Sequence, residues 1–190
     1  MYMPKFNKWL NMLLNGYDEM LTEKNPCNNK EYYQFMVAWI KKYKFLMKKE
    51  LEVYDDIEFL LNLDVDKYVL EETEYFSLND AKNRLFSGQF KKASHVISLS
   101  RSVLYDLITI YSDIDCPCCK DNYLRYLVRT NDKNEALVLC CPMCSWNQDL
   151  AGNQFVPQDG DHYFPATKEQ VAAMSGRDVR ISLSGTVKGR

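Results

Sequence analysis

The sequence predicts an α+β fold, with a mainly helical N-terminal domain, a small β-hairpin module and an irregular C-terminal segment. Apolar residues recur at three- and four-residue spacing through most of the first 112 residues, which is typical of amphipathic helices. Six of the seven cysteines fall within the 29 residues that begin at Cys116, around a segment with the pattern of two strands. We therefore assign residues 1–112 to the helical domain, 113–175 to the cysteine-rich module and 176–190 to a flexible basic tail.

The composition is that of a globular chain, with 46% apolar and 26% charged residues over 190 positions. No run of about 18 apolar residues occurs, so the sequence predicts no membrane-spanning helix. The N-terminus lacks the pattern of a signal peptide. We therefore expect a cytoplasmic protein, in which clustered cysteines favour metal binding over disulfides. The net charge of −2 provides no overall field to attract nucleic acid.

Four helices are predicted in the N-terminal domain, three from apolar residues at helical spacing and the third in the chain from a capping residue at its start and Gly88 at its end. They are expected at residues 4–21, from Lys30 to about Leu61, from Ser77 or Asn79 to Leu85, and at residues 90–111. Gly16 should weaken the first of them locally. The turn-forming residues at 25–29 should end it.

An acid-rich stretch begins where the second helix is expected. Between Glu50 and Glu74 there are ten acids and one base, Lys67. Such a stretch is a solvated helix face or, alternatively, a docking face for a basic protein partner. The candidate partner-binding residues are its ten acids: Glu50, Glu52, Asp55, Asp56, Glu58, Asp64, Asp66, Glu71, Glu72 and Glu74.

Four cysteines form two C-x-x-C pairs, Cys116 with Cys119 and Cys141 with Cys144, and 21 residues lie between the pairs. This spacing predicts a four-thiolate Zn²⁺ site, because each tight turn can direct two thiolates at the same ion. All four positions would be filled by thiolates. The site would therefore have no open position for water and would be structural.

The segment between the two pairs has the pattern of a β-hairpin. Residues 123–128 and 135–139 are predicted strands, and the turn-forming residues at 131–134 join them. A hairpin flanked by two cysteine turns is the topology of a zinc ribbon. After Trp146 the chain is rich in turn residues, apart from a short helix near residues 166–174 for which Thr167 is the expected cap.

Cys118 and Cys140 each adjoin one of the pairs. They are either small structural residues or parts of a redox switch in which oxidation ejects the metal. A thioredoxin-type enzyme is not favoured, because that chemistry uses one C-x-x-C at a helix N-terminus after a strand. His95 is expected in or beside the helical core, and His162 in an exposed loop. No motif for a catalytic triad, a phosphate loop or a zinc protease is present, so we predict no catalytic residues.

Nucleic-acid binding is the main alternative function for the hairpin. Basic and aromatic side chains could form a surface that contacts phosphates and stacks on bases. The residues concerned are Lys120, Arg125, Arg129 and Lys133, together with Tyr123 and Tyr126. Acids flank this surface on both sides, so we rank nucleic-acid binding below protein binding.

The segment Cys116-Pro117-Cys118-Cys119, followed by Cys141-Pro142-Met143-Cys144-Ser145-Trp146, resembles the bacterial cysteine-rich CPCC domain. The resemblance covers roughly residues 114–175, and Asn147-Gln148 stand where that family more often has acids. It implies a small zinc-ribbon-like domain and suggests an immunity protein of a bacterial toxin system.

Together these observations predict a non-catalytic cytoplasmic binding protein with a structural zinc site. In its most specific form the protein binds and neutralises a bacterial toxin, through a surface that complements a basic toxin domain. The alternatives are a nucleic-acid-associated zinc-ribbon protein and a thiol redox sensor.

Overall fold

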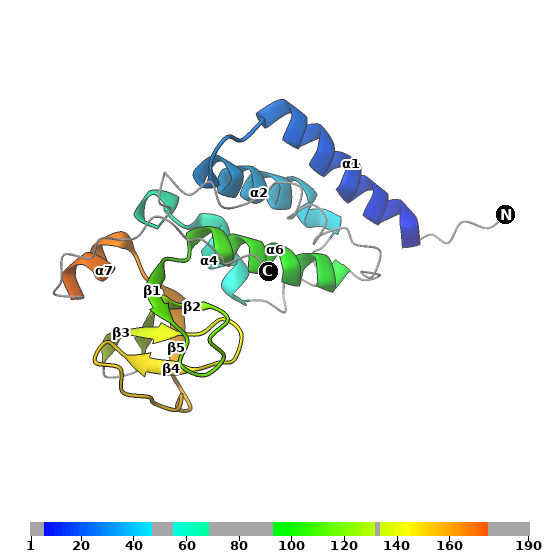
Figure 1. Ribbon diagram of the computed structural model, residues 1–190. Coiled ribbons are helices and arrows are strands. Elements are labelled where there is room, and N and C mark those ends of the chain that lie inside the picture. The colour runs from blue at the N-terminus through cyan, green and yellow to red at the C-terminus, as the bar shows by residue number, and fades with distance from the viewer. Residues whose placement is uncertain (1–5, 47–54, 69–92, 132–133, 175–190) are drawn as a thin grey trace. The chain divides into compact units, whose positions relative to one another are not determined.

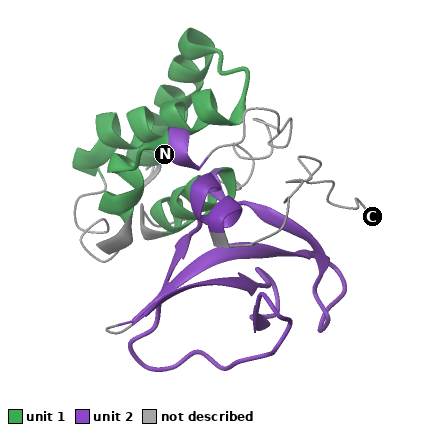
Figure 2. Ribbon diagram, turned by 90° about the vertical axis from the view of Figure 1, so that its left-hand side faces the viewer, with its two compact units in different colours: residues 1–65, 71–107 green, residues 66–70, 108–190 purple. Residues whose placement is uncertain are grey.

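The structure is a computed structural model that describes residues 6–46, 55–68, 93–131 and 134–174. These residues form α-helices and one antiparallel sheet, which confirms the predicted α+β class (Figure 1). The chain divides into two compact units, residues 1–65 with 71–107 and residues 66–70 with 108–190 (Figure 2). The predicted third helix and the 176–190 tail lie outside the described residues.

The first unit is helical, and aromatic residues form much of its core. The ring of Tyr17 from the first helix meets Phe35 and Trp39 from the second edge to face, at centroid distances of 4.9 and 5.4 Å. The indole N–H of Trp39 donates to the Leu13 carbonyl at 3.2 Å, and all four residues are buried. Each such aromatic pair adds about 0.5–1.5 kcal/mol beyond its burial. The helices are α1 (Phe6–Lys24), α2 (Asn29–Tyr43), η1 (Lys44–Leu46), α4 (Asp55–Asn62) and α6 (Ala93–Ile108).

The turn between α1 and α2 lies where the sequence predicted it. Asn25 follows α1 with a φ of 41°, a left-handed conformation that Asn tolerates at helix ends. The Asn28 side chain accepts a hydrogen bond from the Glu31 N–H at 2.9 Å, and the Glu31 carboxylate accepts one from the Cys27 N–H at 2.7 Å. These reciprocal bonds satisfy N–H groups that the start of α2 would otherwise leave unpaired.

Two predicted helices are shorter than expected. The second ends as α-helix at Tyr43 and tightens into a 3₁₀ turn, where the Lys44 N–H donates to the Lys41 carbonyl. Like charges three residues apart disfavour continuation of the helix there. The fourth helix ends at Ile108 instead of residue 111, because residues 108–111 are β-branched or aromatic and lead directly into a strand.

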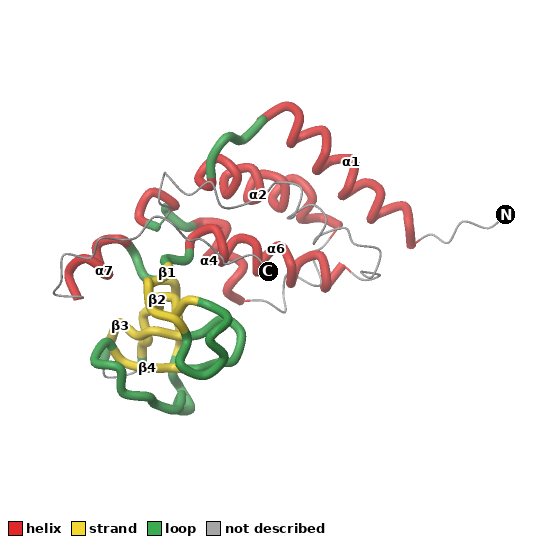
Figure 3. The backbone as a smooth tube through the Cα atoms, viewed as in Figure 1, coloured by secondary structure: helices red, strands yellow, loops and turns green. Residues whose placement is uncertain are grey.

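One five-stranded antiparallel sheet forms the centre of the second unit (Figure 3). Its strands are β1 (Tyr111–Asp115), β2 (Tyr123–Thr130), β3 (Glu135–Cys140), β4 (Asn147–Asp149) and β5 (His162–Pro165). The predicted hairpin is confirmed, since β2 pairs with β3 from Arg125 opposite Cys140 to Thr130 opposite Glu135. The strand order is β1-β2-β3-β4, and β5 also pairs with β2.

The expectation of an irregular segment after Trp146 is wrong at β4 and β5. Strand β4 is the polar tripeptide Asn147-Gln148-Asp149, which has no alternation of apolar residues to reveal it. It forms because its backbone pairs with β3, with Gln148 opposite Leu139. The predicted short helix is confirmed as α7 (Lys168–Met174), and Thr167 and Gln170 exchange hydrogen bonds across its first turn.

The two faces of the sheet carry different clusters of apolar residues. Alternate residues of a strand point to opposite faces, so neighbours in the sequence such as Cys140 and Cys141 separate. The larger cluster contains Ile110, Cys116, Leu124, Tyr126, Val128, Leu137, Leu139, Cys141, Ala166 and Val171, and Cys119 and Trp146 pack against it. The smaller cluster contains Leu127, Val138 and Cys140, covered by Phe155 and Tyr163.

Replacing Gly16 by Ala should destabilise the first unit, although Ala favours helix. A Cβ at this position would collide with the end of the Tyr43 side chain, so the Tyr43 ring can lie here only because Gly16 has no side chain. Overpacking costs about 1–3 kcal/mol, against a propensity gain of about 0.5–1 kcal/mol. Urea unfolding should therefore show a net loss of about 1 kcal/mol for Gly16→Ala. The exposed neighbour Asn15→Ala is the control and should be neutral or slightly stabilising; equal gains in both variants would contradict the close contact.

Candidate metal centre

The first C-x-x-C pair lies in a tight turn between β1 and β2. The Cys116 N–H donates to the Asn122 carbonyl at 2.8 Å, and the Lys120 N–H donates to the Cys116 carbonyl at 3.0 Å. Lys120, directly after Cys119, has a φ of 58°. This left-handed residue reverses the chain, so that the turn closes on itself and its backbone is satisfied without help from the cysteine side chains.

The second pair lies in a turn of the same design between β3 and β4. The Cys141 N–H donates to the Trp146 carbonyl at 2.8 Å, and Ser145, directly after Cys144, again has a φ of 58°. The Met143 N–H points at Cys141 Sγ, 3.4 Å away. Backbone N–H groups that point at sulfur favour the thiolate form. Pairing of β2 with β3 brings the two turns to the same end of the hairpin.

The four predicted ligands come together in the structure. Cys116 Sγ lies 3.4 Å from Cys144 Sγ, and Cys119 Sγ lies 3.7 Å from Cys141 Sγ, so each close pair joins one turn to the other. All four sulfurs lie within 4.8 Å of one another, and no other group of this kind occurs among the described residues. All four cysteines are free, so these contacts are not disulfides. The cluster could therefore hold a metal ion.

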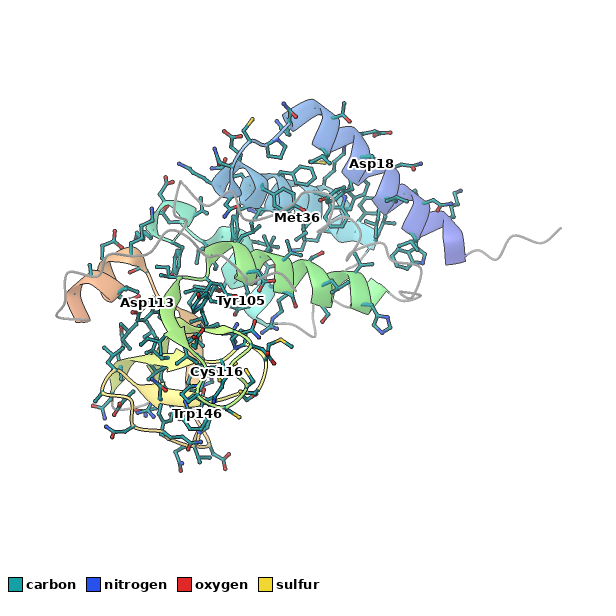
Figure 4. All side chains as sticks on the ribbon, in the orientation of Figure 1. Asp18, Met36, Tyr105, Asp113, Cys116 and Trp146 are labelled. Atoms are coloured by element: carbon teal, nitrogen blue, oxygen red, sulfur yellow. The ribbon has the colours of Figure 1, made fainter. Side chains whose placement is uncertain are left out.

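One side of the cluster is buried and the other faces solvent. Cys116 and Cys141 are buried, whereas Cys144 is exposed. Figure 4 labels Cys116 and Trp146, the aromatic residue that packs against the same apolar cluster. The indole N–H of Trp146 donates to the buried Gln148 side chain at 2.9 Å. This bond explains how β4 can bury a polar residue. The sequence alone does not indicate that Trp146 and Gln148 are bonded.

Burial raises the pKa of Cys141 to about 12, against smaller opposing effects of nearby backbone N–H groups. A buried thiol of this kind stays protonated at neutral pH unless a cation compensates for loss of the proton. Binding of a metal would therefore release protons. The affinity for metal should fall as the pH falls, because protons compete for the same sulfurs.

The two additional cysteines lie in different environments. Cys118 is exposed in the first turn, whereas Cys140 is buried on the opposite face of the sheet, in the smaller cluster. Burial raises the pKa of Cys140 to about 11, and the nearby charge of Arg125 lowers it only in part. The redox-switch hypothesis named Cys118 and Cys140 equally. The structure favours a packing role for Cys140, because buried thiols with a raised pKa react slowly.

Alkylation of the native, metal-loaded protein near pH 8 should modify Cys27 and Cys118 and leave Cys140 unmodified. The first two thiols are exposed, whereas Cys140 is inaccessible and its raised pKa keeps the thiolate scarce. Mass spectrometry of the digested protein measures the extent of modification at each cysteine separately. The same reaction in denaturant, where all seven thiols should react, is the control. Modification of Cys140 in the native protein as fast as of Cys27 would contradict this placement.

The candidate acidic surface is only partly described. Glu58 is exposed, but it pairs with Lys44 at 2.6 Å, and this hydrogen bond and charge lower the pKa of Glu58. Asp64 in the first unit and Asp66 in the second are exposed. Part of the acidic stretch is therefore already matched by a lysine of the same chain. Asp55 and Asp56 begin α4, and the remaining five candidates lie outside the described residues: Glu50, Glu52, Glu71, Glu72 and Glu74.

The basic and aromatic residues proposed for nucleic acid do not share one exposed face. Tyr126 is 8% exposed in the larger cluster, so it is not free to stack on a base. The Arg129 guanidinium lies over the Phe155 ring at 4.8 Å, and Arg125 Nε is buried without a hydrogen-bond partner. Lys120 is exposed, and Lys133 lies outside the described residues.

Both histidines are exposed. His162 belongs to β5 instead of a loop, and His95 lies on the surface of α6. The expectation of a core or boundary position for His95 is therefore wrong. The buried face of α6 follows Val96, Ser100 and Val103, to which His95 does not belong.

Comparisons with protein families, curated proteins and solved structures give no match to this chain. The similarity to the CPCC family therefore stays a prediction from the motif. No helix in the described part of the chain is both long enough and apolar enough to cross a membrane.

Proposed function

We propose that Cys116, Cys119, Cys141 and Cys144 hold one structural Zn²⁺ ion in a zinc-ribbon-like module. Two thiolates that each lie about 2.3 Å from a tetrahedral ion are roughly 3.8 Å apart. The two closest sulfur pairs, at 3.4 and 3.7 Å, suit that arrangement. Four thiolates favour Zn²⁺ over harder cations such as Mg²⁺ or Ca²⁺, which prefer oxygen. This cluster of four sulfurs is the observation that carries the proposal.

Substitution of cobalt for zinc tests the ligand set. The cobalt-loaded chain should show the absorption of a tetrahedral four-thiolate complex, at one ion per chain. Replacing Cys119 by Ser should remove one sulfur and change that spectrum, whereas replacing the exposed Cys27, which belongs to the first unit, should not. A cobalt spectrum without thiolate absorption would rule out the site.

The same geometry supports a function in binding and not in catalysis. Four thiolates fill a tetrahedral shell, so a metal held there has no open position at which to activate water or a substrate. Its role is then to fix the two turns and the sheet edge that they flank. The similarity of the cysteine motif to the CPCC family gives this binding role its most specific form, an immunity protein that neutralises a bacterial toxin.

Exposed residues of the acidic stretch favour binding to a protein with a basic surface, such as a toxin domain that acts on nucleic acid. Glu58 and Asp64 belong to the acidic stretch and lie on the surface of the first unit. Opposite charges on two proteins accelerate and orient their association.

Co-expression with a toxin encoded directly upstream of this chain tests the immunity function. The chain should protect the host, and Asp64→Lys should reduce its affinity for the toxin by about 5–10-fold at low salt, with a smaller effect at high salt. Glu23→Lys, at another exposed acid outside the acidic stretch, is the matched control. An upstream gene that encodes no toxin, or a toxin whose effect is unchanged, would overturn the proposal.

A further inference from the structure

The face of the sheet that carries the smaller apolar cluster also carries two arginines of β2. Residues directly opposite each other in paired strands share a face. Arg125 lies opposite Cys140 of β3, and Arg129 lies opposite Tyr163 of β5. Leu127, between the two arginines, belongs to the same cluster as Cys140. The two arginines, four residues apart on one strand, therefore point to the same side of the sheet.

The charge of Arg129 is compensated within the chain, whereas that of Arg125 is not. The Arg129 guanidinium lies over the Phe155 ring at 4.8 Å, and it interacts with the carboxylate of Asp161. Arg125 Nε is buried without a hydrogen-bond partner, and no carboxylate of the described residues forms an ion pair with this side chain. Buried N–H groups in proteins are almost always paired, so an unpaired guanidinium N–H indicates a group that pairs with it on binding.

The acids near this face already have hydrogen-bond partners. Asp149 of β4 lies opposite Val138, and its carboxylate accepts hydrogen bonds from the backbone and side-chain N–H groups of Asn153 at 2.8 and 2.9 Å. Asp161 accepts one from the Gln158 N–H at 2.9 Å. These fixed negative charges repel a polyanion such as nucleic acid. A single carboxylate at Arg125 meets much less of this repulsion.

We propose that Arg125 binds a carboxylate of a protein partner on this face of the sheet. The Nε–H and one Nη–H of an arginine form a fork that matches the two oxygens of a carboxylate, so one acidic side chain pairs the buried Nε–H and neutralises the charge. Partly buried Tyr163 and Phe155 supply the aromatic surface that commonly surrounds an interface arginine. This inference goes beyond the proposed function, because it concerns the second unit and an acidic group of the partner.

Nuclear magnetic resonance of the arginine Nε–H groups tests the inference in the full-length, ¹⁵N-labelled chain. The probe is the blocked tripeptide acetyl-Phe-Asp-Phe-amide, and the same peptide with Asn in place of Asp is its neutral control. The acidic peptide should shift the Arg125 resonance to saturation, and the neutral peptide should bind at least about tenfold more weakly. Equal responses to the two peptides, or no response to either, would overturn the inference. Tighter binding of a single-stranded oligonucleotide or of inorganic phosphate would also overturn it, in favour of a phosphate site.

Two substitutions separate binding by Arg125 from a structural role. Arg125→Lys keeps the charge but loses the fork, so it should weaken binding of the acidic peptide by about tenfold, whereas Arg129→Lys on the same strand should change it by less than about threefold. Arg125→Met should leave the unfolding temperature of the chain unchanged or raise it, because the substitution removes an unpaired buried donor. A lower unfolding temperature would assign Arg125 to the core and contradict the inference.

Discussion

Removal of zinc with a strong chelator should unfold the sheet of the second unit and leave the helices of the first unit folded. A four-thiolate structural site contributes about 10–16 kcal/mol in small zinc peptides, which is as large as the whole stability of a typical domain. Without the ion, four sulfurs within 4.8 Å of one another, two of them from buried cysteines, have no cation to hold them together. The two turns then lose the interaction that fixes one against the other.

Hydrogen exchange tests this prediction because it measures the protection of each backbone amide separately. Amides of β2 and β3 should lose protection after chelation, whereas those of α2 should keep it, because the core of the first unit contains no cysteine of the cluster. Adding zinc back should restore protection. Lowering the pH should have the same effect as chelation, since protons compete for the thiolates. Retention of full protection in β2 and β3 without metal would show that the site is dispensable for folding.

Replacing Trp39 by Ala should be the most damaging single substitution in the first unit. Trp39 is fully buried, contacts Tyr17 edge to face and donates to the Leu13 carbonyl. Removing a buried Trp costs about 3–5 kcal/mol, from lost burial and from the cavity that remains. Loss of the hydrogen bond also leaves a buried carbonyl without that partner. Urea unfolding, monitored by the circular dichroism signal of the helices, should show this loss of stability.

The control for Trp39→Ala is Phe45→Ala, an aromatic residue of the same unit that is 66% exposed. Substitution there should change the free energy of unfolding by less than about 0.5 kcal/mol. The zinc content of the Trp39 variant should be unchanged, since the metal site belongs to the other unit. Equal effects of the two substitutions would contradict the described core, and loss of zinc from the Trp39 variant would contradict the independence of the two units.

The parts of the fold that follow from local chemistry could be predicted from the sequence. The hairpin follows from two apolar runs around a turn, and the start of α7 follows from a Thr167 side chain that caps it. The four ligands follow from cysteine spacing alone, because a C-x-x-C turn brings its two sulfurs together wherever it occurs. Each of these features depends on residues that lie close together in the chain.

The features that were missed depend on residues far apart in the chain. Strand β4 is polar and forms because its backbone pairs with that of β3. The buried Gln148 side chain accepts a hydrogen bond from the Trp146 indole N–H, which compensates for its burial. Gly16 was expected merely to weaken a helix, whereas it makes room for Tyr43 from the next one. Tertiary contacts of this kind override local preference and leave no periodic pattern in the sequence.

The redox-switch hypothesis treats the two additional cysteines alike, whereas the structure places them in different environments. Cys118 is exposed in the first turn, whereas Cys140 is buried in the smaller cluster. The position of Cys140 follows from alternation along β3, which directs Cys140 and Cys141 to opposite faces of the sheet. The same alternation, applied to the sequence, would have distinguished the two additional cysteines.

The central claim is that four cysteines bind one structural zinc ion. Elemental analysis of the purified chain, without added metal, measures this most directly. We predict about one zinc ion per chain, reduced to near zero in Cys141→Ser and unchanged in Cys140→Ser, its neighbour on the opposite face of the sheet. A chain that contains no zinc, or a Cys141→Ser variant that retains it, would contradict the claim.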